Sequence, residues 1–361
     1  MRISFPRWLL LCTLPLLAAK EGPDTLFSEV RWQAAVKACD SASLYAPHVN
    51  KGRYFNPWMP LPEKGFLDML KWRVLDKKPD FSAEEEAYLP DVFPQLPKRL
   101  KEFGPGDCLV WVGHASFLIR ISGVYWLVDP ILSDRAMIPK RRTDPAFSML
   151  EIDQIAPMFN ILITHNHYDH LDQKTIQALP AGCRVFAPLG LRESIRDMNR
   201  KRVLEMDWWQ SIQADSSTVV YCLPAQHWSR RIFQRTNRTL WCSFLLQTPH
   251  TVIYIGGDSG YFIGYREFAK RFPSIDFALL PMGAYRPRWF MHYSHMNVEE
   301  MVQAFHDLNA HTLIPYHWGA FQLGDEPAGA PGLDLKRYLK KEPLQPGRLR
   351  IPAVGEIIPI Y

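Results

Sequence analysis

The sequence predicts an α/β sandwich, in which two β-sheets pack face to face and helices cover their outer faces. The 361 residues are 47% hydrophobic and 22% charged, which provides a large core and excludes a disordered chain, a coiled coil or a polytopic membrane protein. From Cys108 onward, short apolar runs alternate with turns. The first runs pair as hairpins and helices separate the later ones, which indicates strands in two sheets.

The first twenty residues differ from the rest of the chain. Arg2 and Arg7 precede an apolar run, Trp8 to Ala19, and Lys20 closes it. The run is too short to cross a bilayer, which takes about 20 residues, but it fits the apolar part of a signal peptide. We expect residues 1–20 to be a signal peptide or a hydrophobic membrane anchor, with a helix packed on the body as the alternative. The protein is therefore expected to be membrane-associated or exported to the periplasmic or extracytoplasmic face.

Residues 21–106 are rich in proline and aromatic residues and show no clear strand alternation. We expect an irregular N-terminal lead-in with short helices, such as Ser82–Tyr88, packed on the main domain at 107–361. The strands predicted in that domain are Cys108–Val112, Ser116–Ile121, Val124–Val128, Asn160–Thr164, Arg184–Ala187, Thr218–Pro224, Leu240–Leu246, Thr251–Ile255, Phe277–Leu280 and Thr312–Pro315. The predicted helices are Asp172–Leu179, Leu191–Met198, Arg266–Arg271 and Val298–Leu308.

The charge balance is mildly basic, with 42 Lys and Arg against 37 Asp and Glu. This balance is compatible with an anionic membrane surface and does not indicate a nucleic-acid partner. The local cluster of Arg230, Arg231, Arg235 and Arg238 contains no interleaved stacking aromatics, so it indicates a solvated face or a lipid contact. The six cysteines form no C-x-x-C pair and are expected to be buried thiols.

The most informative segment follows the predicted strand at 160–164. His165, His167, Asp169 and His170 lie within six residues, just before a predicted helix. Imidazole and carboxylate groups are the ligands that suit zinc and related divalent metals. Four such groups on one tight loop cannot all reach a single ion with good geometry, so the arrangement suits two neighbouring metals.

Further ligand-type residues also follow predicted strands. His227, Asp258 and His317 each come directly after an apolar run, and Gly256 and Gly257 before Asp258 allow a close approach of the backbone. Strand ends are the usual position of a site in a fold built on sheets. Together with the histidine loop, these residues predict one coherent metal site.

These residues resemble a known signature. His165-Asn166-His167-Tyr168-Asp169-His170, followed by the three single residues, resembles the H-x-H-x-D-H pattern of the metallo-β-lactamase superfamily. Other segments resemble the N-acylphosphatidylethanolamine-hydrolysing phospholipase D family. These are GRYFNPW at 52–58, WVGHAS at 111–116, PAQHW at 224–228, GDSGY at 257–261, GAYRPRWFM at 283–291 and HWG at 317–319. GRYFNPW and GAYRPRWFM are the segments specific to the phospholipase branch.

The resemblance covers roughly residues 52–321 and implies the αββα metallo-β-lactamase fold with two zinc ions. It implies that one zinc is held by His165, His167 and His227, and the other by Asp169, His170 and His317, with Asp258 bridging both. It further implies that Tyr168 and His295 contact the substrate. Iron or manganese would suit the same ligands.

The activity implied by the resemblance is that of a phospholipase D-type phosphodiesterase. Such an enzyme hydrolyses N-acylphosphatidylethanolamine, a phospholipid of the membrane surface, to phosphatidic acid and an N-acylethanolamine. Two metals about 3.5–4 Å apart would activate a water and clamp the phosphodiester, and Asp169 or Asp258 is the candidate acceptor of the water proton. The alternatives are a sugar-phosphate lactonase or a soluble phosphodiesterase on the same fold, and a silent metal-binding module. The oligomeric state is left open, with a homodimer among the outcomes.

Four other residues have either a role in the site or a structural role. His114 lies between two predicted strands, and we expect it to support the ligands rather than to bind metal. Arg286 and Arg288 would either meet a lipid phosphate or form ion pairs. His292 would either line the mouth of the site or lie in a solvated loop.

Overall fold

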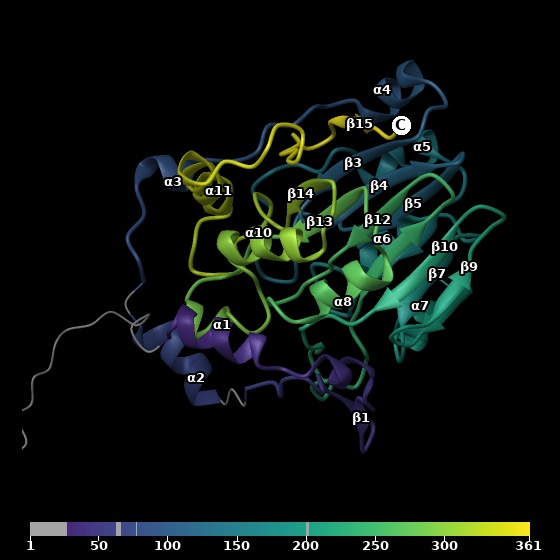
Figure 1. The fold of residues 1–361 in the computed structure, drawn as a ribbon. Helices are drawn as coiled ribbons and strands as arrows, with labels where there is room; N and C mark the ends of the chain where they lie inside the picture. Colours follow the sequence, from purple (N-terminus) through teal and green to yellow (C-terminus); the bar gives the residue numbers. More distant parts are fainter. Residues whose placement is uncertain (1–26, 63–65, 77, 200–201) are drawn as a thin grey trace, which may run out of the picture.

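The computed structural model describes residues 27–62, 66–76, 78–199 and 202–361, which form two large sheets flanked by helices (Figure 1). The predicted signal peptide or anchor at 1–20 lies outside the described residues. Among the described helices, none has both the length and the apolar character needed to span a bilayer.

The first sheet has seven strands in the spatial order β15-β3-β4-β5-β6-β7-β8. The strands β3, β4 and β5 form an antiparallel meander, β15 pairs antiparallel with β3, and β6, β7 and β8 continue parallel to β5. Their bounds are Cys108–Gly113 (β3), Ser116–Ile121 (β4), Val124–Val128 (β5), Asn160–Leu162 (β6), Arg184–Pro188 (β7), Arg202–Met206 (β8) and Ile357–Pro359 (β15).

The second sheet has six strands in the order β14-β13-β12-β11-β10-β9. The strands β9 to β12 are antiparallel neighbours, whereas β12, β13 and β14 run parallel. Their bounds are Ser211–Gln213 (β9), Val219–Leu223 (β10), Ser243–Gln247 (β11), Val252–Ile255 (β12), Phe277–Pro281 (β13) and Thr312–Tyr316 (β14). Each sheet thus joins a hairpin-rich half to a parallel half, as the change in sequence pattern predicts.

Helices cover the outer faces, which confirms the predicted αββα sandwich (Figure 1). Helix α7 packs on α6 and β8, and α10 packs on α8, α11 and β13. The bounds in this region are Met149–Glu151 (η4), Ile152–Ile155 (α5), Gln173–Ala178 (α6), Arg192–Asn199 (α7), Gly264–Arg271 (α8), Arg288–Met291 (α9), Val298–Asp307 (α10) and Ala330–Lys341 (α11). Every residue of β3 and β4 is buried, so the core lies between layers on both sides of these strands.

Most predicted strands match within one or two residues. Two strands differ from the prediction at one end. The strand predicted at Leu240–Leu246 begins only at Ser243. The strand β6 ends at Leu162, before Thr164, because the Thr164 N–H donates to the side chain of Asp129 rather than to a neighbouring strand. The strands β8, β9 and β15 were not predicted, since short segments of three to five residues carry little periodic signal.

The lead-in is more ordered than predicted. The predicted helix at 82–88 is present as α3 and begins at Ser82 with a capping box. A nine-residue helix, α1, and a two-stranded hairpin were not predicted. The bounds are Glu29–Lys37 (α1), Ser41–Tyr45 (η2), Val49–Asn50 (β1), Arg53–Tyr54 (β2), Phe66–Leu70 (α2), Lys71–Leu75 (η3), Ala83–Ala87 (α3) and Leu96–Phe103 (α4). The division of the chain at 106/107 stays a prediction.

Candidate metal centre

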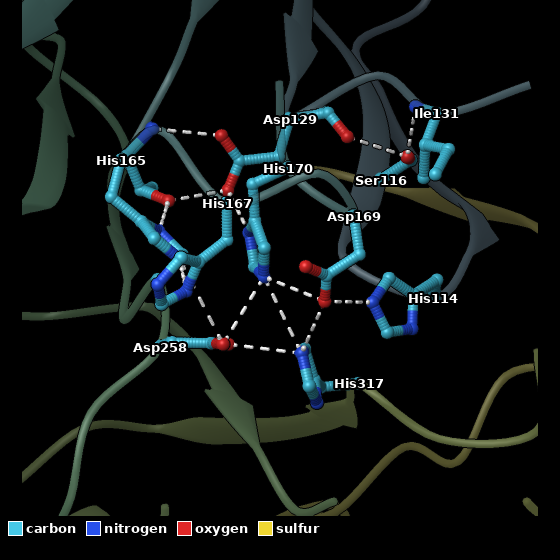
Figure 2. Close-up of polar contacts among 12 residues, drawn as sticks. His114, Ser116, Asp129, Ile131, His165, His167, Asp169, His170, Asp258 and His317 are labelled. Carbon is cyan, nitrogen blue, oxygen red and sulfur yellow. Dashed lines mark hydrogen bonds and ion pairs between the residues drawn. The ribbon is translucent and has the colours of Figure 1, made fainter. Parts of the chain in front are cut away.

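All seven predicted ligand positions lie in neighbouring groups at one edge of the sandwich, and Figure 2 labels each of them except His227. The chain leaves β6 and runs directly into the histidine loop, residues 165–172. The other positions follow strands of the second sheet: His227 comes after β10, Asp258 after β12 and His317 after β14. The carboxyl ends of strands from both sheets therefore supply the site, which explains why residues up to 152 positions apart lie together.

The first group, which we call the His227 cluster, comprises His165, His167, His227 and Asp258. The Nδ1 atom of His167 lies 2.9 Å from Nε2 of His165 and 3.2 Å from Nε2 of His227. The Oδ2 atom of Asp258 lies 3.9 Å from Nε2 of His227 and 4.0 Å from Nε2 of His165. Three imidazole nitrogens and one carboxylate oxygen thus converge on one point.

The second group, which we call the His317 cluster, comprises His114, Asp169, His170 and His317. The Oδ2 atom of Asp169 lies 3.4 Å from Nε2 of both His170 and His317. Asp258 connects the two clusters, because its Oδ2 lies 3.2 Å from His170 Nε2 and its Oδ1 lies 3.1 Å from His317 Nε2 (Figure 2). The grouping matches the predicted division into two sites with Asp258 between them.

Burial keeps the three histidines of the His227 cluster neutral. Loss of hydration lowers the pKa of His165 and His227 well below the ordinary value and lowers that of His167 to about 4. A neutral imidazole offers a lone pair to a metal. The nitrogens that converge are Nε2 of His165 and His227 and Nδ1 of His167, so each neutral ring can direct a lone pair at one ion.

The His317 cluster has the opposite balance. Burial opposes a charge on His170 and His317, but the carboxylates around them outweigh it. Asp258 contributes most, and the pKa of His170 lies well above its ordinary value while that of His317 rises to about 9. Burial likewise opposes a charge on Asp258, yet these two imidazoles hold its pKa well below the usual range. The carboxylates of this cluster thus favour a positive charge beside them, and a bound divalent cation would take the place of the protons on His170 and His317. The donor set therefore fits two divalent metals.

Asp129 is a supporting residue that the sequence analysis missed. It follows β5, its Oδ2 lies 2.7 Å from Nδ1 of His170, and its carboxylate also accepts from Thr164 N and Oγ1 at 2.7 and 2.6 Å (Figure 2). It therefore fixes the ring of one predicted ligand and the start of the histidine loop. The sequence contains a pattern that could have identified Asp129, because it directly follows an apolar strand, as Asp258 does.

His114 lies where a supporting residue is expected. Its Nε2 is 2.9 Å from Oδ2 of Asp169, and its carbonyl oxygen accepts from the N–H of His317. It is fully buried between β3 and β4. One histidine therefore orients both a carboxylate and an imidazole of the same cluster, although its Nε2 is also close enough to serve as a ligand.

The two predicted substrate contacts lie at the edge of the centre. The Nδ1 atom of His295 is 4.0 Å from Oδ2 of Asp258 and has no hydrogen-bond partner among the described residues. Tyr168 is half-buried, and its hydroxyl oxygen accepts from the N–H of Ile232 while its ring lies under the Arg231 guanidinium. Contact of these two side chains with a substrate stays a prediction.

The lead-in takes part in the site through Asn56. This buried side chain donates to the carbonyl oxygen of His227 at 3.3 Å and to the hydroxyl of Tyr293 at 2.7 Å, and it accepts from Trp241 Nε1 at 3.2 Å. Nearby, Trp58 Nε1 donates to the side chain of Gln226. The GRYFNPW segment is therefore part of the wall that holds His227.

Gln226 extends this buried network to two further loops. Its side-chain amide donates to the carbonyl oxygens of Tyr261 and Tyr293, both at 3.2 Å. His227 Nδ1 lies 3.2 Å from the carbonyl oxygen of Ser294, which fixes the ring. The loops that carry His227, Asp258 and His295 are thus tied together by uncharged hydrogen bonds.

The GAYRPRWFM segment supports the same loops through ion pairs. Arg288 is buried, pairs with Glu29 of α1 at 2.6 Å and Glu300 of α10 at 2.9 Å, and donates to the carbonyl oxygen of His295. Arg286 pairs with Asp334 at 3.2 Å. Both arginines thus follow the ion-pair alternative, and Arg288 lies in the interior.

His292 is half-buried against the lead-in rather than fully solvated. It stacks on Phe27 and meets the ring of Trp32 in α1 edge-on.

The chain matches the β-lactamase superfamily domain over residues 125–318. It is 37% identical over 258 residues to an uncharacterised protein of Mycobacterium tuberculosis, covering 68% of this chain and 67% of that protein. It is 32% identical over 271 residues to a protein of Saccharomyces cerevisiae named N-acyl-phosphatidylethanolamine-hydrolyzing phospholipase D, mitochondrial, covering 68% of this chain but only 56% of that protein.

The fold is similar to the crystal structure of a possible metal-dependent hydrolase from Veillonella parvula. The TM-score is 0.59 at 15% sequence identity, over 71% of this chain and 100% of that one.

Proposed function

The chain belongs to the metallo-β-lactamase superfamily of metal-dependent hydrolases, and we propose that it is a zinc phosphodiesterase of the phospholipase D type. The proposed substrate is N-acylphosphatidylethanolamine, and the products are phosphatidic acid and an N-acylethanolamine. The relative from Saccharomyces cerevisiae, whose name carries this activity, supports the substrate class.

One observation carries the proposal. The two sequence segments that are specific to the phospholipase branch, residues 52–58 and 283–291, lie more than 200 positions apart, yet both contact loops of the metal centre. Asn56 of the first segment bonds to the backbone of His227, and Arg288 of the second bonds to the backbone of His295. The features that distinguish this branch are therefore built into the wall of the site.

The metals would be held as the two clusters divide. His165, His167 and His227 would hold one ion, Asp169, His170 and His317 the other, and Asp258 would lie between them. When bound, two divalent ions supply Lewis-acid activation of water and charge compensation at the phosphodiester. Zinc fits the imidazole-rich donor set, and iron or manganese would also fit it.

The side chains then have distinct roles. A ring N–H of His295 would donate to a phosphate oxygen, and Tyr168 would line the approach of the lipid. A water would attack phosphorus in line with the departing N-acylethanolamine oxygen, and Asp258 or Asp169 would accept the water proton. That proton would pass to the departing oxygen, so that the alcohol leaves neutral. His114 and Asp129 would keep Asp169 and His170 oriented throughout.

The test is turnover of N-acylphosphatidylethanolamine in mixed micelles by the purified full chain, with His167→Ala as the matched variant. We expect release of the N-acylethanolamine by the wild type and loss of release in the variant. Metal content is measured on both samples, because it separates an empty centre from an inactive one.

Two outcomes would redirect the proposal. A protein with two bound metals that hydrolyses a soluble phosphodiester or a sugar-phosphate lactone, but not the lipid, would retain the hydrolase and sink the lipid assignment. A protein that binds no zinc, iron or manganese would contradict the metal centre itself.

A further inference from the structure

Two exposed turns contact the histidine loop and carry an unusual apolar composition. Among the described residues, exposed large apolar side chains are sequence neighbours in two places only. One pair is Met137 and Ile138, which are 45% and 70% exposed, and the other is Ile232 and Phe233, which are 53% and fully exposed. Single exposed apolar residues are ordinary, but adjacent pairs at turn tips indicate a contact surface.

Both turns are fixed to the loop that carries the predicted ligands. Arg231 donates to the carbonyl oxygens of Asn166 and Leu171 at 2.9 and 3.0 Å, which holds the Ile232–Phe233 turn. The other turn is attached through Ser133, whose hydroxyl donates to Asp172 at 2.6 Å. Both turns are therefore tied to the histidine loop, one at Asn166 and Leu171 and the other at Asp172.

The second turn is braced from inside. Arg141 is buried and donates to the carbonyl oxygens of Ile131 and Ser133 at 2.7 and 3.0 Å. The N–H of Arg142 donates to the carbonyl oxygen of Ala320, three residues after His317. These hydrogen bonds hold in place the backbone on both sides of the Met137–Ile138 turn.

The tips keep bulky side chains at a conformational cost. Met137 and Phe233 have φ values of 59° and 65°, in the left-handed region where glycine costs least. A large apolar side chain at such a position, fully exposed in the case of Phe233, does not stabilise the isolated fold.

Cations surround both tips. Six exposed side chains lie on these turns and their flanks, and none forms an ion pair with an acidic side chain of the described residues: Arg135, Lys140, Arg142, Arg230, Arg235 and Arg238. Residues 228–241 contain four arginines and no acidic residue. The Met137–Ile138 turn and its flank also carry the exposed carboxylates of Asp134 and Asp144, but the cations outnumber them, so the surface is complementary to a negatively charged partner.

We propose that the Met137–Ile138 and Ile232–Phe233 turns dock the protein on an anionic phospholipid bilayer, with the apolar tips in the interface and the six cations among the headgroups. Two tips of two residues are too small for a stable protein interface, which buries about 800 Å² per partner. They suit shallow insertion, in which apolar side chains enter the bilayer boundary and cations remain at its surface. The docked metal centre would face the lipid. This inference rests on the proposed function in that the partner has the class of the proposed substrate.

The experiment measures binding of the full chain to vesicles of phosphatidylcholine alone or mixed with phosphatidylglycerol. The double variant Ile232→Ser/Phe233→Ser is compared with Leu150→Ser, which removes a side chain that is 91% exposed elsewhere. We expect the double variant to bind anionic vesicles about tenfold more weakly, because two inserted side chains are lost. Leu150→Ser should match the wild type, and added salt should weaken binding of both.

Hydrogen exchange locates the contact, because the predicted anchor at 1–20 could by itself hold the chain on vesicles. Anionic vesicles should slow hydrogen exchange in residues 134–142 and 230–236 of the wild type. This protection would identify the two turns as the membrane contact. Unchanged exchange there, with or without vesicle binding, overturns the docking surface. A change in oligomeric state of the double variant, seen by sedimentation without vesicles, together with unprotected turns would assign the surface to a dimer contact instead.

Turnover separates this inference from the proposed function. Protected turns without hydrolysis of N-acylphosphatidylethanolamine would leave the docking surface and sink the substrate. Hydrolysis of that lipid with unprotected turns would support the proposed substrate and overturn the docking surface. The double variant should retain wild-type hydrolysis of a soluble phosphodiester such as bis(p-nitrophenyl) phosphate, which shows that its metal centre is intact.

Discussion

The two halves of the metal centre are held by different parts of the chain. The His317 cluster is supported from within the sandwich, by Asp129 directly after β5 and His114 between β3 and β4. The His227 cluster depends on Asn56 and Trp58, which lie in the lead-in more than 150 residues earlier. The first support is charged and the second is neutral. The sandwich therefore supplies the supports of the His317 cluster and the start of the histidine loop, while the wall beside His227 also includes the segment that precedes the sandwich.

The largest expected effect tests whether the halves are coupled. Asp258 contacts both clusters, so Asp258→Asn should lower the content of both metals, whereas His227→Ala should lower one. Turnover by Asp258→Asn should fall by more than the roughly 10- to 100-fold typical of groups that only orient ligands. Metal analysis of the purified variants checks this. Full metal content in Asp258→Asn would show that the clusters are independent.

A buried carboxylate outside the metal centre predicts that the stability of the fold depends on pH. Glu326 is buried, and its carboxylate accepts from the N–H groups of Tyr285 and Arg286. Burial raises its pKa from 4.5 to about 7. The raised pKa means that the folded state binds this proton more tightly than the unfolded chain. The resulting stability is complete below pH 4.5 and is lost as the pH rises through about 7.

Glu326→Gln should remove this dependence. Between pH 5 and pH 8, the free energy of unfolding of the wild type should fall by about 2–3 kcal/mol relative to the variant. Denaturant titrations at constant ionic strength measure the difference. Parallel pH profiles for the two proteins would show that the Glu326 pKa is not raised. Asn56→Ala should by contrast give a profile parallel to that of the wild type, since its network contains no carboxylate.

Asp129→Asn tests the support of the His317 cluster itself. The variant keeps the shape but loses the charge that faces Nδ1 of His170, and metal affinity should fall about 10- to 100-fold. Competition with a chelator measures the affinity of each site. We expect the more weakly held metal to be that of the His317 cluster, which a structure at limiting metal would show. Equal weakening of both metals would contradict separate supports.

Asn56→Ala tests the neutral support. Truncation removes the buried hydrogen bonds of Asn56 to His227, Tyr293 and Trp241, which should cost about 1–3 kcal/mol of unfolding free energy, although Tyr293 and Trp241 keep one other partner each. The metal of the His227 cluster should be lost first in a chelator titration. Asn50→Ala is the control, because Asn50 is an exposed asparagine of the same lead-in. Identical chelator titration curves for the two variants would show that the lead-in does not support the His227 cluster.

The smallest effect concerns the surface contacts of the lead-in. Arg337 of α11 pairs with Glu85 of α3 at 2.8 Å and with Asp334, but its side chain is 50% exposed. Arg337→Ala should change the unfolding free energy by less than about 1 kcal/mol and leave metal content unchanged. A larger loss would show that the lead-in is held by its surface pairs as well as by its buried network.

The sequence by itself determined the parts of this protein that are local. Strand ends followed by histidine or aspartate located all seven residues that the structure gathers at one edge, and the spacing of His165, His167, Asp169 and His170 indicated two groups. A short loop at the end of a strand has few conformations, so its spacing carries geometric information. The alternation of apolar runs was likewise enough for the sandwich and most of its strands.

Only the tertiary structure decided what supports these residues. Nothing in the sequence near Asn56 or Arg288 indicates that one reaches His227 and the other His295, because such contacts depend on how two sheets and their loops pack. The same holds for the two apolar turns. From the sequence alone, Met137 and Phe233 would be expected in the core, but both are exposed in the structure. Burial depends on how the whole molecule packs and not on the residue type.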